Sequence, residues 1–345
     1  MKKILYLSFL FLTAASFLNV SCYFTNVPVY PGAAAFHEVA ESPFYLEGNQ
    51  SITAMAANGG IVAAVSSEGK IAFSEDHGVS WEVTHNIIDA FPEGIHFNAI
   101  CGAEGYFLAA GDFGKAAWSK DGKVWHAGVI GPMSPKNVLA LSAGRLKGQL
   151  VFLAGGTDGR LAYALNSPQG PWYQISFSPF GDKENEGESI HAIGYGKVNN
   201  IGIFTAAGDN GKIAVMKDIT GNLYGPVSAA SRNTFRAVTF GNSRFIAVGD
   251  GGLMKISADP ASYSWTTIID TDFGLRPFYG IAYDSSIEKF VLVTTDAILG
   301  FSENGEKWSA ASLSNILEKR NISAVICTDK RIVVGFTDGS IAYSN

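Results

Sequence analysis

The chain has 345 residues, of which 47% are hydrophobic and 16% charged, and its formal net charge is −6 at pH 7. This balance excludes intrinsic disorder and leaves ample material for a core. The negative charge and the lack of a Lys/Arg cluster argue against nucleic-acid binding, because phosphate contacts need clustered cations. A chain of this length can form one large all-β domain.

The first 22 residues are typical of an export signal. Lys2 and Lys3 precede an apolar run from Ile4 to Leu18, which is too short for a comfortable membrane span of ~20 residues. A small residue, Ser21, then stands directly before Cys22, and this arrangement resembles a bacterial lipoprotein signal. The resemblance implies that Cys22 is acylated and anchors the chain in the envelope. The alternative is ordinary signal-peptidase cleavage, which would give a soluble secreted or periplasmic protein.

Residues 23–35 contain two prolines and a glycine and indicate a tether. From residue 36 to residue 345 one unit recurs, and it starts with a short strand of the form apolar–variable–small–apolar. The seven copies are Ile52-Thr53-Ala54-Met55, Phe97-Asn98-Ala99-Ile100, Val138-Leu139-Ala140-Leu141, Ile190-His191-Ala192-Ile193, Phe235-Arg236-Ala237-Val238, Phe278-Tyr279-Gly280-Ile281 and Ile322-Ser323-Ala324-Val325. The small third residue suggests sheets that crowd together near an axis.

Each copy continues with a second apolar strand, a turn that carries an acid and usually a glycine, a third strand, and a polar turn that usually leads through a Trp into a fourth strand. Seven such units predict an all-β, seven-bladed β-propeller of four-stranded antiparallel blades. The last copy stops at Asn345 after three strands. We therefore expect the segment from Phe36 to Phe44 to supply its outer strand and close the ring.

Three of the polar turns share a pattern of Ser, Asp or Asn, Gly and Trp. The segment from Ser74 to Trp81 matches the Asp-box, or bacterial neuraminidase repeat, and the segments from Ser119 to Trp125 and from Ser302 to Trp308 are similar. The residues that carry the pattern are Ser74, Asp76, Gly78, Trp81, Ser119, Asp121, Trp125, Ser302, Asn304, Gly305 and Trp308. In proteins with this repeat the box is structural and lies on the periphery of the propeller.

Nearly the whole domain resembles the sialidase-like propeller superfamily, and the short blades look most like photosystem II stability/assembly factor-type propellers. Those relatives are assembly factors or binding modules, so the resemblance implies a binding role. A sialidase-type site needs three arginines around a substrate carboxylate, and only Arg236 occupies an inner-strand position here. We therefore expect no catalytic residues, and no cofactor.

No metal site is expected either, because the six histidines show no metal-ligand spacing. The two cysteines of the domain, Cys101 and Cys327, fall on the inner strands of non-adjacent blades and are expected to stay unpaired thiols.

The best candidate for a binding face is one mouth of the central channel. The turn after each second strand and the loop entering each first strand lie at the same end of a propeller of this topology. The turn acids are Glu68, Asp112, Asp158, Asp209, Asp250, Asp296 and Asp338, and the chemically distinctive inner positions are Asn98, His191, Arg236 and Tyr279. A ring of acids would attract a basic partner. The alternative is that each acid only bonds the backbone of its own turn.

Exposed aromatic residues on the entry loops, such as Phe180 and Phe273, could anchor a partner or could tuck under their own loops. Together these features predict a monomeric envelope lipoprotein that binds or scaffolds a protein partner through one propeller face. Two alternatives stay open: a glycan-binding or glycoside-hydrolase propeller, and a structural protein without a defined pocket.

Overall fold

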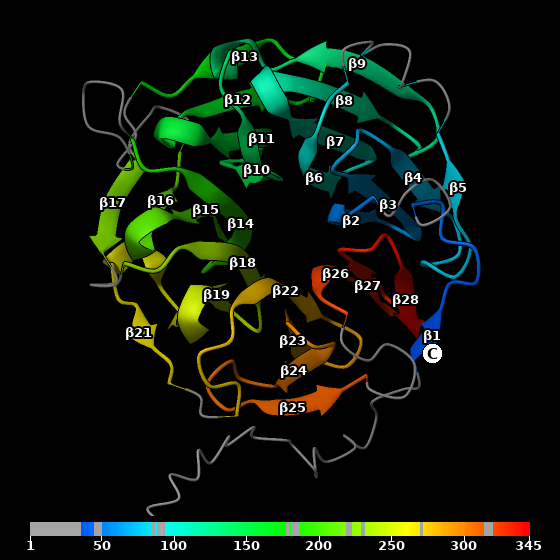
Figure 1. The fold of residues 1–345 in the computed structure, drawn as a ribbon. Coiled ribbons are helices and arrows are strands. Elements are labelled where there is room, and N and C mark those ends of the chain that lie inside the picture. The colour runs from blue at the N-terminus through cyan, green and yellow to red at the C-terminus, as the bar shows by residue number, and fades with distance from the viewer. Residues whose placement is uncertain are drawn as a thin grey trace, which may run out of the picture.

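The computed structural model describes residues 36–44, 50–84, 87, 91, 94–176, 180, 187–218, 223–228, 232–269, 272–313 and 320–345. Seven antiparallel sheets of four strands stand around a central channel (Figure 1), which confirms the predicted seven-bladed β-propeller. The predicted signal, Cys22 and the tether lie outside the described residues. Within the described ranges, no helix is long and apolar enough to cross a membrane.

Blades 1 to 6 run outward in chain order from their innermost strands, and blade 7 takes its outermost strand from the start of the domain. The innermost strands are β2 (Ile52–Asn58), β6 (Phe97–Ala103), β10 (Val138–Leu146), β14 (Ile190–Val198), β18 (Phe235–Gly241), β22 (Phe278–Asp284) and β26 (Ile322–Cys327). The second strands are β3 (Ile61–Ser66), β7 (Tyr106–Gly111), β11 (Gln149–Gly156), β15 (Ile201–Gly208), β19 (Arg244–Gly249), β23 (Lys289–Thr294) and β27 (Ile332–Phe336). Blades 1 to 7 are numbered in this order.

The strands of the outer half of each blade are shorter. The third strands are β4 (Ile71–Ser74), β8 (Lys115–Ser119), β12 (Leu161–Leu165), β16 (Lys212–Met216), β20 (Met254–Ser257), β24 (Ile298–Ser302) and β28 (Ile341–Ser344). The outermost strands are β5 (Glu82–Val83), β9 (Trp125–Val129), β13 (Trp172–Gln174), β17 (Leu223–Ser228), β21 (Thr266–Thr267), β25 (Ser309–Ser312) and β1 (Phe36–Glu38). Short 3₁₀ turns are η2 (Asp112–Gly114), η3 (Gly131–Met133), η4 (Thr157–Gly159), η5 (Asp209–Gly211), η6 (Asp250–Gly252) and η7 (Pro260–Ser262).

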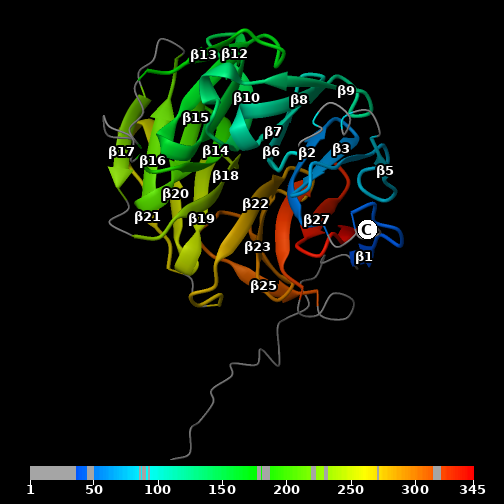
Figure 2. The ribbon, with the colours of Figure 1, turned by 45° about the horizontal axis from the view of Figure 1, so that its top comes forward.

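The second strands are apolar along almost their whole length because neighbouring blades cover both of their faces. In β19, for example, every residue from Phe245 to Gly249 is buried. The blades approach one another closely where glycine faces an aromatic ring: a Cβ added to Gly196 of β14 would lie 2.1 Å from the Phe240 ring of the next blade. The core is therefore a set of clusters between blades. Figure 2 shows the radial arrangement of the sheets that these clusters join.

The ring closes as predicted, by pairing the two ends of the domain. Strand β1 joins β28 in blade 7, with Phe36 opposite Ser344 and Glu38 opposite Ala342. The strand itself is shorter than the predicted segment, and the residues after it act as a clamp instead. Phe44 is fully buried at the seam between blades 7 and 1. The buried Nζ of Lys70 donates to the Pro43 carbonyl oxygen at 3.0 Å.

Hydrogen bonds explain the Ser, Asp or Asn, Gly and Trp pattern of the three polar turns. In the first, Ser74 Oγ donates to Asp76 Oδ1 at 2.8 Å and accepts from the Gly78 N–H at 2.8 Å, and the Trp81 indole donates to the Gly78 carbonyl at 2.9 Å. The same bonds recur in the turns that contain Asp121 and Asn304. These side chains hold the hairpin between third and fourth strands, on the outer half of each blade.

Acid is expected to weaken the first two of these turns. Burial raises the pKa of the Asp76 carboxyl, but hydrogen bonds from Ser80, Ser74 and Val79 outweigh it and lower the pKa below its usual value. Hydrogen bonds likewise outweigh burial and lower the pKa of Asp121. A carboxyl whose pKa is lower in the folded chain than in the unfolded chain stabilises the fold at any pH above its unfolded pKa of about 3.9. The protein loses this stabilisation as the pH falls through the folded pKa.

Asp76→Asn should therefore reduce the loss of stability between neutral and acid pH. The bonds from Ser80 to Oδ2 are lost at every pH, while the amide oxygen can accept the bonds made to Oδ1 without titrating. Asn304 already does this in blade 6, where its Oδ1 accepts from the Glu306 and Lys307 N–H groups. Urea unfolding midpoints at about pH 7 and about pH 3 measure the effect. Glu82→Gln, an exposed carboxyl on β5, is the control. An equal acid loss in the Asp76 variant and the wild type would contradict the prediction.

Two side-chain expectations are also settled. Cys101 and Cys327 are free thiols, as predicted, and burial raises the pKa of Cys101 to about 12, so this thiol stays neutral. Phe180 and Phe273, considered as exposed anchors, are each 1% exposed and belong to hydrophobic clusters of the core.

Candidate binding site at the channel mouth

A bulge at the start of each innermost strand aims the variable residue of the repeat. The pairing with the second strand shifts between the first and third residue of every copy, so that the second residue has no partner. The bulged residues are Thr53, Asn98, Leu139, His191, Arg236, Tyr279 and Ser323. Bulges are known to redirect side chains. Here they turn one residue per blade toward the channel.

The bulged residues of blades 1 and 2 are polar, and both form hydrogen bonds to backbone carbonyls. The bulged residue of blade 3 is apolar. Thr53 Oγ1 donates to backbone carbonyls of Val65 and Phe97, at 3.1 and 2.6 Å. Asn98 Nδ2 donates to the Val138 carbonyl at 3.0 Å, and Leu139 has no polar group. This side of the mouth therefore offers few free hydrogen-bonding groups.

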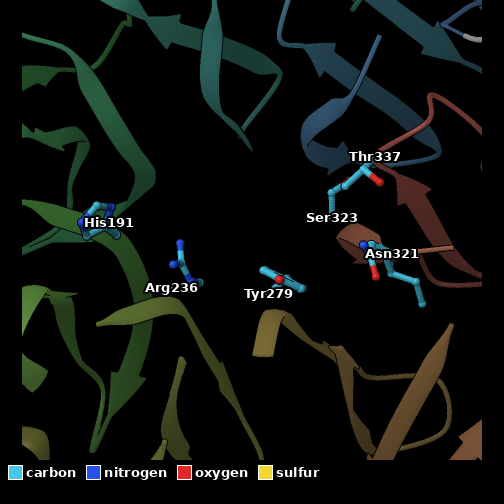
Figure 3. A pocket seen from close by; sticks show the side chains of 7 residues that line it. His191, Arg236, Tyr279, Asn321, Ser323 and Thr337 are labelled. Carbon is cyan, nitrogen blue, oxygen red and sulfur yellow. The ribbon is translucent and has the colours of Figure 1, made fainter. Parts of the chain in front are cut away.

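Blades 4 to 7 present a different surface. A cavity of about 280 Å³ lies at the channel mouth (Figure 3). Its lining residues are His191, Arg236, Tyr279, Asn321, Ile322, Ser323 and Thr337. It adjoins a second space of about 200 Å³ along the channel, lined by the innermost strands of all seven blades. We call His191, Arg236, Tyr279, Asn321 and Thr337 the polar crescent.

Arg236 is held in place by Asp250 of its own blade. Its Nε and Nη2 donate to Asp250 Oδ1 and Oδ2, at 2.5 and 2.8 Å. The hydrogen bond to Asp250 raises the pKa of Arg236 and outweighs burial, so the guanidinium is always charged. Both bonds use one edge of the guanidinium. The second terminal nitrogen, Nη1, has no hydrogen-bond partner among the described residues and lies at the cavity.

His191 is oriented by a second acid. Its Nε2 lies 2.9 Å from Asp209 Oδ1, and Asp209 also accepts from the Ser189 N–H at 2.8 Å and from Thr234 Oγ1 at 3.0 Å. Burial raises the pKa of Asp209, but these partners outweigh it and lower the pKa. The carboxylate therefore stays charged and fixes the imidazole ring in the wall of the cavity.

The seven turn acids fall into two groups. In the first group, the acid stands two residues before the last residue of its turn; its members are Asp112, Asp209 and Asp250. Asp209 pairs with the bulged residue of blade 4, His191, and Asp250 pairs with that of blade 5, Arg236. Glu68, Asp158, Asp296 and Asp338 stand directly before the last residue of the turn. Of these, Asp158 pairs with Lys136, Asp296 with Arg276 and Asp338 with Arg320, at 2.6, 3.8 and 3.4 Å. Among the described residues, Glu68 and Asp112 form no ion pair.

Four of the seven carboxylates thus lie beside a lysine or arginine, and a fifth lies beside His191. The four cations weaken the field that a ring of free acids would create. Sequence reasoning placed His191, Arg236 and Tyr279 at the mouth but missed Asn321 and Thr337. A signal for Thr337 was present: it is the residue of blade 7 that matches Asp209 and Asp250 in their turns.

Neither a known protein family nor a curated protein matches the sequence of this chain. Its fold is that of solved seven-bladed propellers. YCF48 bound to D1 peptide has a TM-score of 0.67 and 13% identity, covering 92% of this chain and 99% of that one. YCF48 from Cyanidioschyzon merolae has a TM-score of 0.66 and 12% identity, covering 90% and 99%. A catalytically inactive virginiamycin B lyase from Staphylococcus aureus with quinupristin has a TM-score of 0.67 and 12% identity, and the match covers 89% of this chain and 98% of that one.

Proposed function

We propose that this protein is a non-catalytic binding or assembly scaffold that takes a segment of a protein partner at the polar crescent. The observation that carries the proposal is the convergence of free hydrogen-bonding groups from three successive blades, 5 to 7, on one cavity. The Arg236 Nη1, the Tyr279 hydroxyl, the Asn321 amide and the Thr337 hydroxyl have no hydrogen-bond partner among the described residues. A polypeptide supplies both the acceptors and the donors that such a surface needs.

The charges at the channel mouth indicate which chemical groups the bound segment of the partner would carry. The free edge of Arg236 fits a carbonyl or carboxylate oxygen, since Asp250 already holds the other edge. The acids without an ion pair, Glu68 and Asp112, belong to blades 1 and 2, so a basic residue of the partner would be matched on that side of the mouth. The similarity to YCF48 bound to D1 peptide supports a peptide-binding propeller by analogy of fold. We further propose that Cys22 anchors the protein in the bacterial envelope.

Arg236→Ala is expected to lower partner capture at least tenfold, because it removes the free donor and leaves Asp250 unpaired. The measurement is cross-linking capture from intact envelopes, quantified by mass spectrometry against the wild type. Arg244→Ala is the matched control: this arginine lies away from the cavity and pairs with Glu306. Equal capture by all three forms, or no specifically enriched protein, would refute the proposal.

Acid–base catalysis is a second candidate, favoured by the His191–Asp209 pair in the wall of the same cavity. A histidine oriented by a partly exposed carboxylate can act as a general base. The two functions differ in what happens to the bound molecule. A scaffold returns the captured partner with its mass unchanged after incubation with the purified protein, whereas an enzyme changes that mass.

A further inference from the structure

A second pocket lies at the perimeter of the propeller, between blades 2 and 3. It has a volume of about 220 Å³ and is far from the channel in the radial order of the strands, since it reaches the outermost strands β9 and β13. We define the perimeter pocket by six of its lining residues, Trp118, His126, Gly128, Pro168, Gln169 and Trp172. Nothing in the proposed scaffold function uses this pocket.

Two indole rings are fixed in its walls. Trp118 of β8 lies opposite His126 of β9 in the sheet, and the two rings stack with centroids 4.5 Å apart and planes 27° from parallel. Both Trp118 and Trp172 pack on the hydrophobic cluster between the two blades. The Trp172 Nε1 donates to the Pro168 carbonyl at 3.1 Å, which sets the orientation of that ring. The pocket therefore has rigid, flat, partly exposed aromatic walls.

Gly128 leaves the middle of the pocket open. It follows His126 by two residues in β9, so both face the pocket side of the sheet. A Cβ added to Gly128 would meet only the Ala116 carbonyl oxygen, at 4.0 Å. Neighbouring atoms therefore leave room for a side chain at this position, and the φ of Gly128 is not positive, so neither packing nor backbone conformation requires a glycine. Glycine inside a strand weakens the strand and often marks a place where a ligand approaches closely.

The hydrogen-bonding groups of the pocket are free. The Trp118 indole N–H, the His126 imidazole and the Gln169 side-chain amide have no hydrogen-bond partner among the described residues, and neither Asp, Glu, Lys nor Arg lines the pocket. A phosphate or carboxylate would find no lysine or arginine among the lining residues. Hydrolysis of a glycosidic bond would need a pair of carboxyl groups, so the site is suited to binding rather than cleavage.

We propose that the perimeter pocket binds one ring of a neutral saccharide. The apolar C–H face of the sugar would lie on Trp172, since His126 already stacks on Trp118, and its hydroxyls would bond to His126 and Gln169. The volume is smaller than that of pockets for drug-sized ligands, which suits a single ring. A proline-rich peptide also uses aromatic walls, but it needs an elongated groove for successive turns of its helix. The observations favour the sugar.

The test uses the full chain, labelled with 5-fluorotryptophan and held in a detergent without a sugar headgroup. Maltotriose, cellotriose and chitotriose are titrated separately to millimolar concentrations while ¹⁹F NMR follows the six tryptophans. We expect at least one sugar to shift the Trp118 and Trp172 signals and leave the others in place. Gly128→Leu fills the pocket and should weaken that binding at least tenfold.

Gly131→Leu is the matched control, because a Cβ at Gly131 meets nothing within 4 Å and this residue lies outside the pocket. It should bind like the wild type. The proposal is overturned if none of the sugars shifts these signals, if the Gly128 variant binds as well as the wild type, or if a polyproline peptide shifts them and the sugars do not. Because the pocket and the polar crescent share no residue, Arg236→Ala should leave sugar binding unchanged whether or not the scaffold function holds.

Discussion

Phe44→Ala is expected to destabilise the propeller by about 3–5 kcal/mol, the usual cost of emptying a buried aromatic site. The ring is fully buried and packs with Val39, Ile52 and Val333 where blades 7 and 1 meet. Its loss would open a cavity at the seam that closes the ring. Urea unfolding followed by tryptophan fluorescence measures the change in the free energy of unfolding.

Phe113→Ala is the control for this variant. Phe113 is the same residue type but 58% exposed, in the turn η2, and its removal should change stability by no more than about 0.5 kcal/mol. If Phe44→Ala proved as stable as Phe113→Ala, the segment after β1 would not be a clamp, and pairing of β1 with β28 alone would have to close the ring.

Gly208→Ala is expected to be similarly damaging, by about 3 kcal/mol or more, for a different reason. An added Cβ would lie 2.0 Å from the Ser189 carbonyl oxygen, a backbone atom that cannot move without moving the loop that enters β14. That loop also supplies the Ser189 N–H to Asp209, so the shift should displace the His191–Asp209 pair.

The variant should therefore lose stability and also lower the partner capture that depends on the polar crescent. Thermal unfolding and the capture assay are the two measurements. Gly131→Ala, where a Cβ meets nothing within 4 Å, should change neither. A Gly208 variant with wild-type stability would mean that the entry loop is free to shift and does not set the geometry of the site.

The number of blades and the closure of the ring could be predicted because the repeat is visible in the sequence. A small residue is needed in each innermost strand where the sheets crowd, and a last copy without a fourth strand requires one from elsewhere. The bulge was harder to predict. The residues from Ile190 to Ile193 follow the same apolar–variable–small–apolar pattern with or without a bulge. Only the strand pairing shows that His191 has no partner in β15.

The acids show a second limit of the sequence. Asp158 and Asp209 look equivalent beside their glycines, yet they differ by one position in the turn, and one residue decides whether a side chain meets a loop lysine or a channel histidine. Phe180 and Phe273 show a third: an aromatic residue in a polar loop can close over the core, and here both do. Side-chain direction in loops depends on contacts that no local pattern contains.

The pairing of Phe36 with Ser344 also has a consequence for folding. The first strand of the domain has no partner until the last strand has been made, so the ring can close only after the whole domain has left the ribosome. Contacts between such distant residues are slow to form because closing a long loop costs entropy before any contact repays it. Until then blade 7 keeps an exposed edge at β28, the kind of edge that recruits other strands. Aggregation before the ring closes is thus a hazard that this architecture carries.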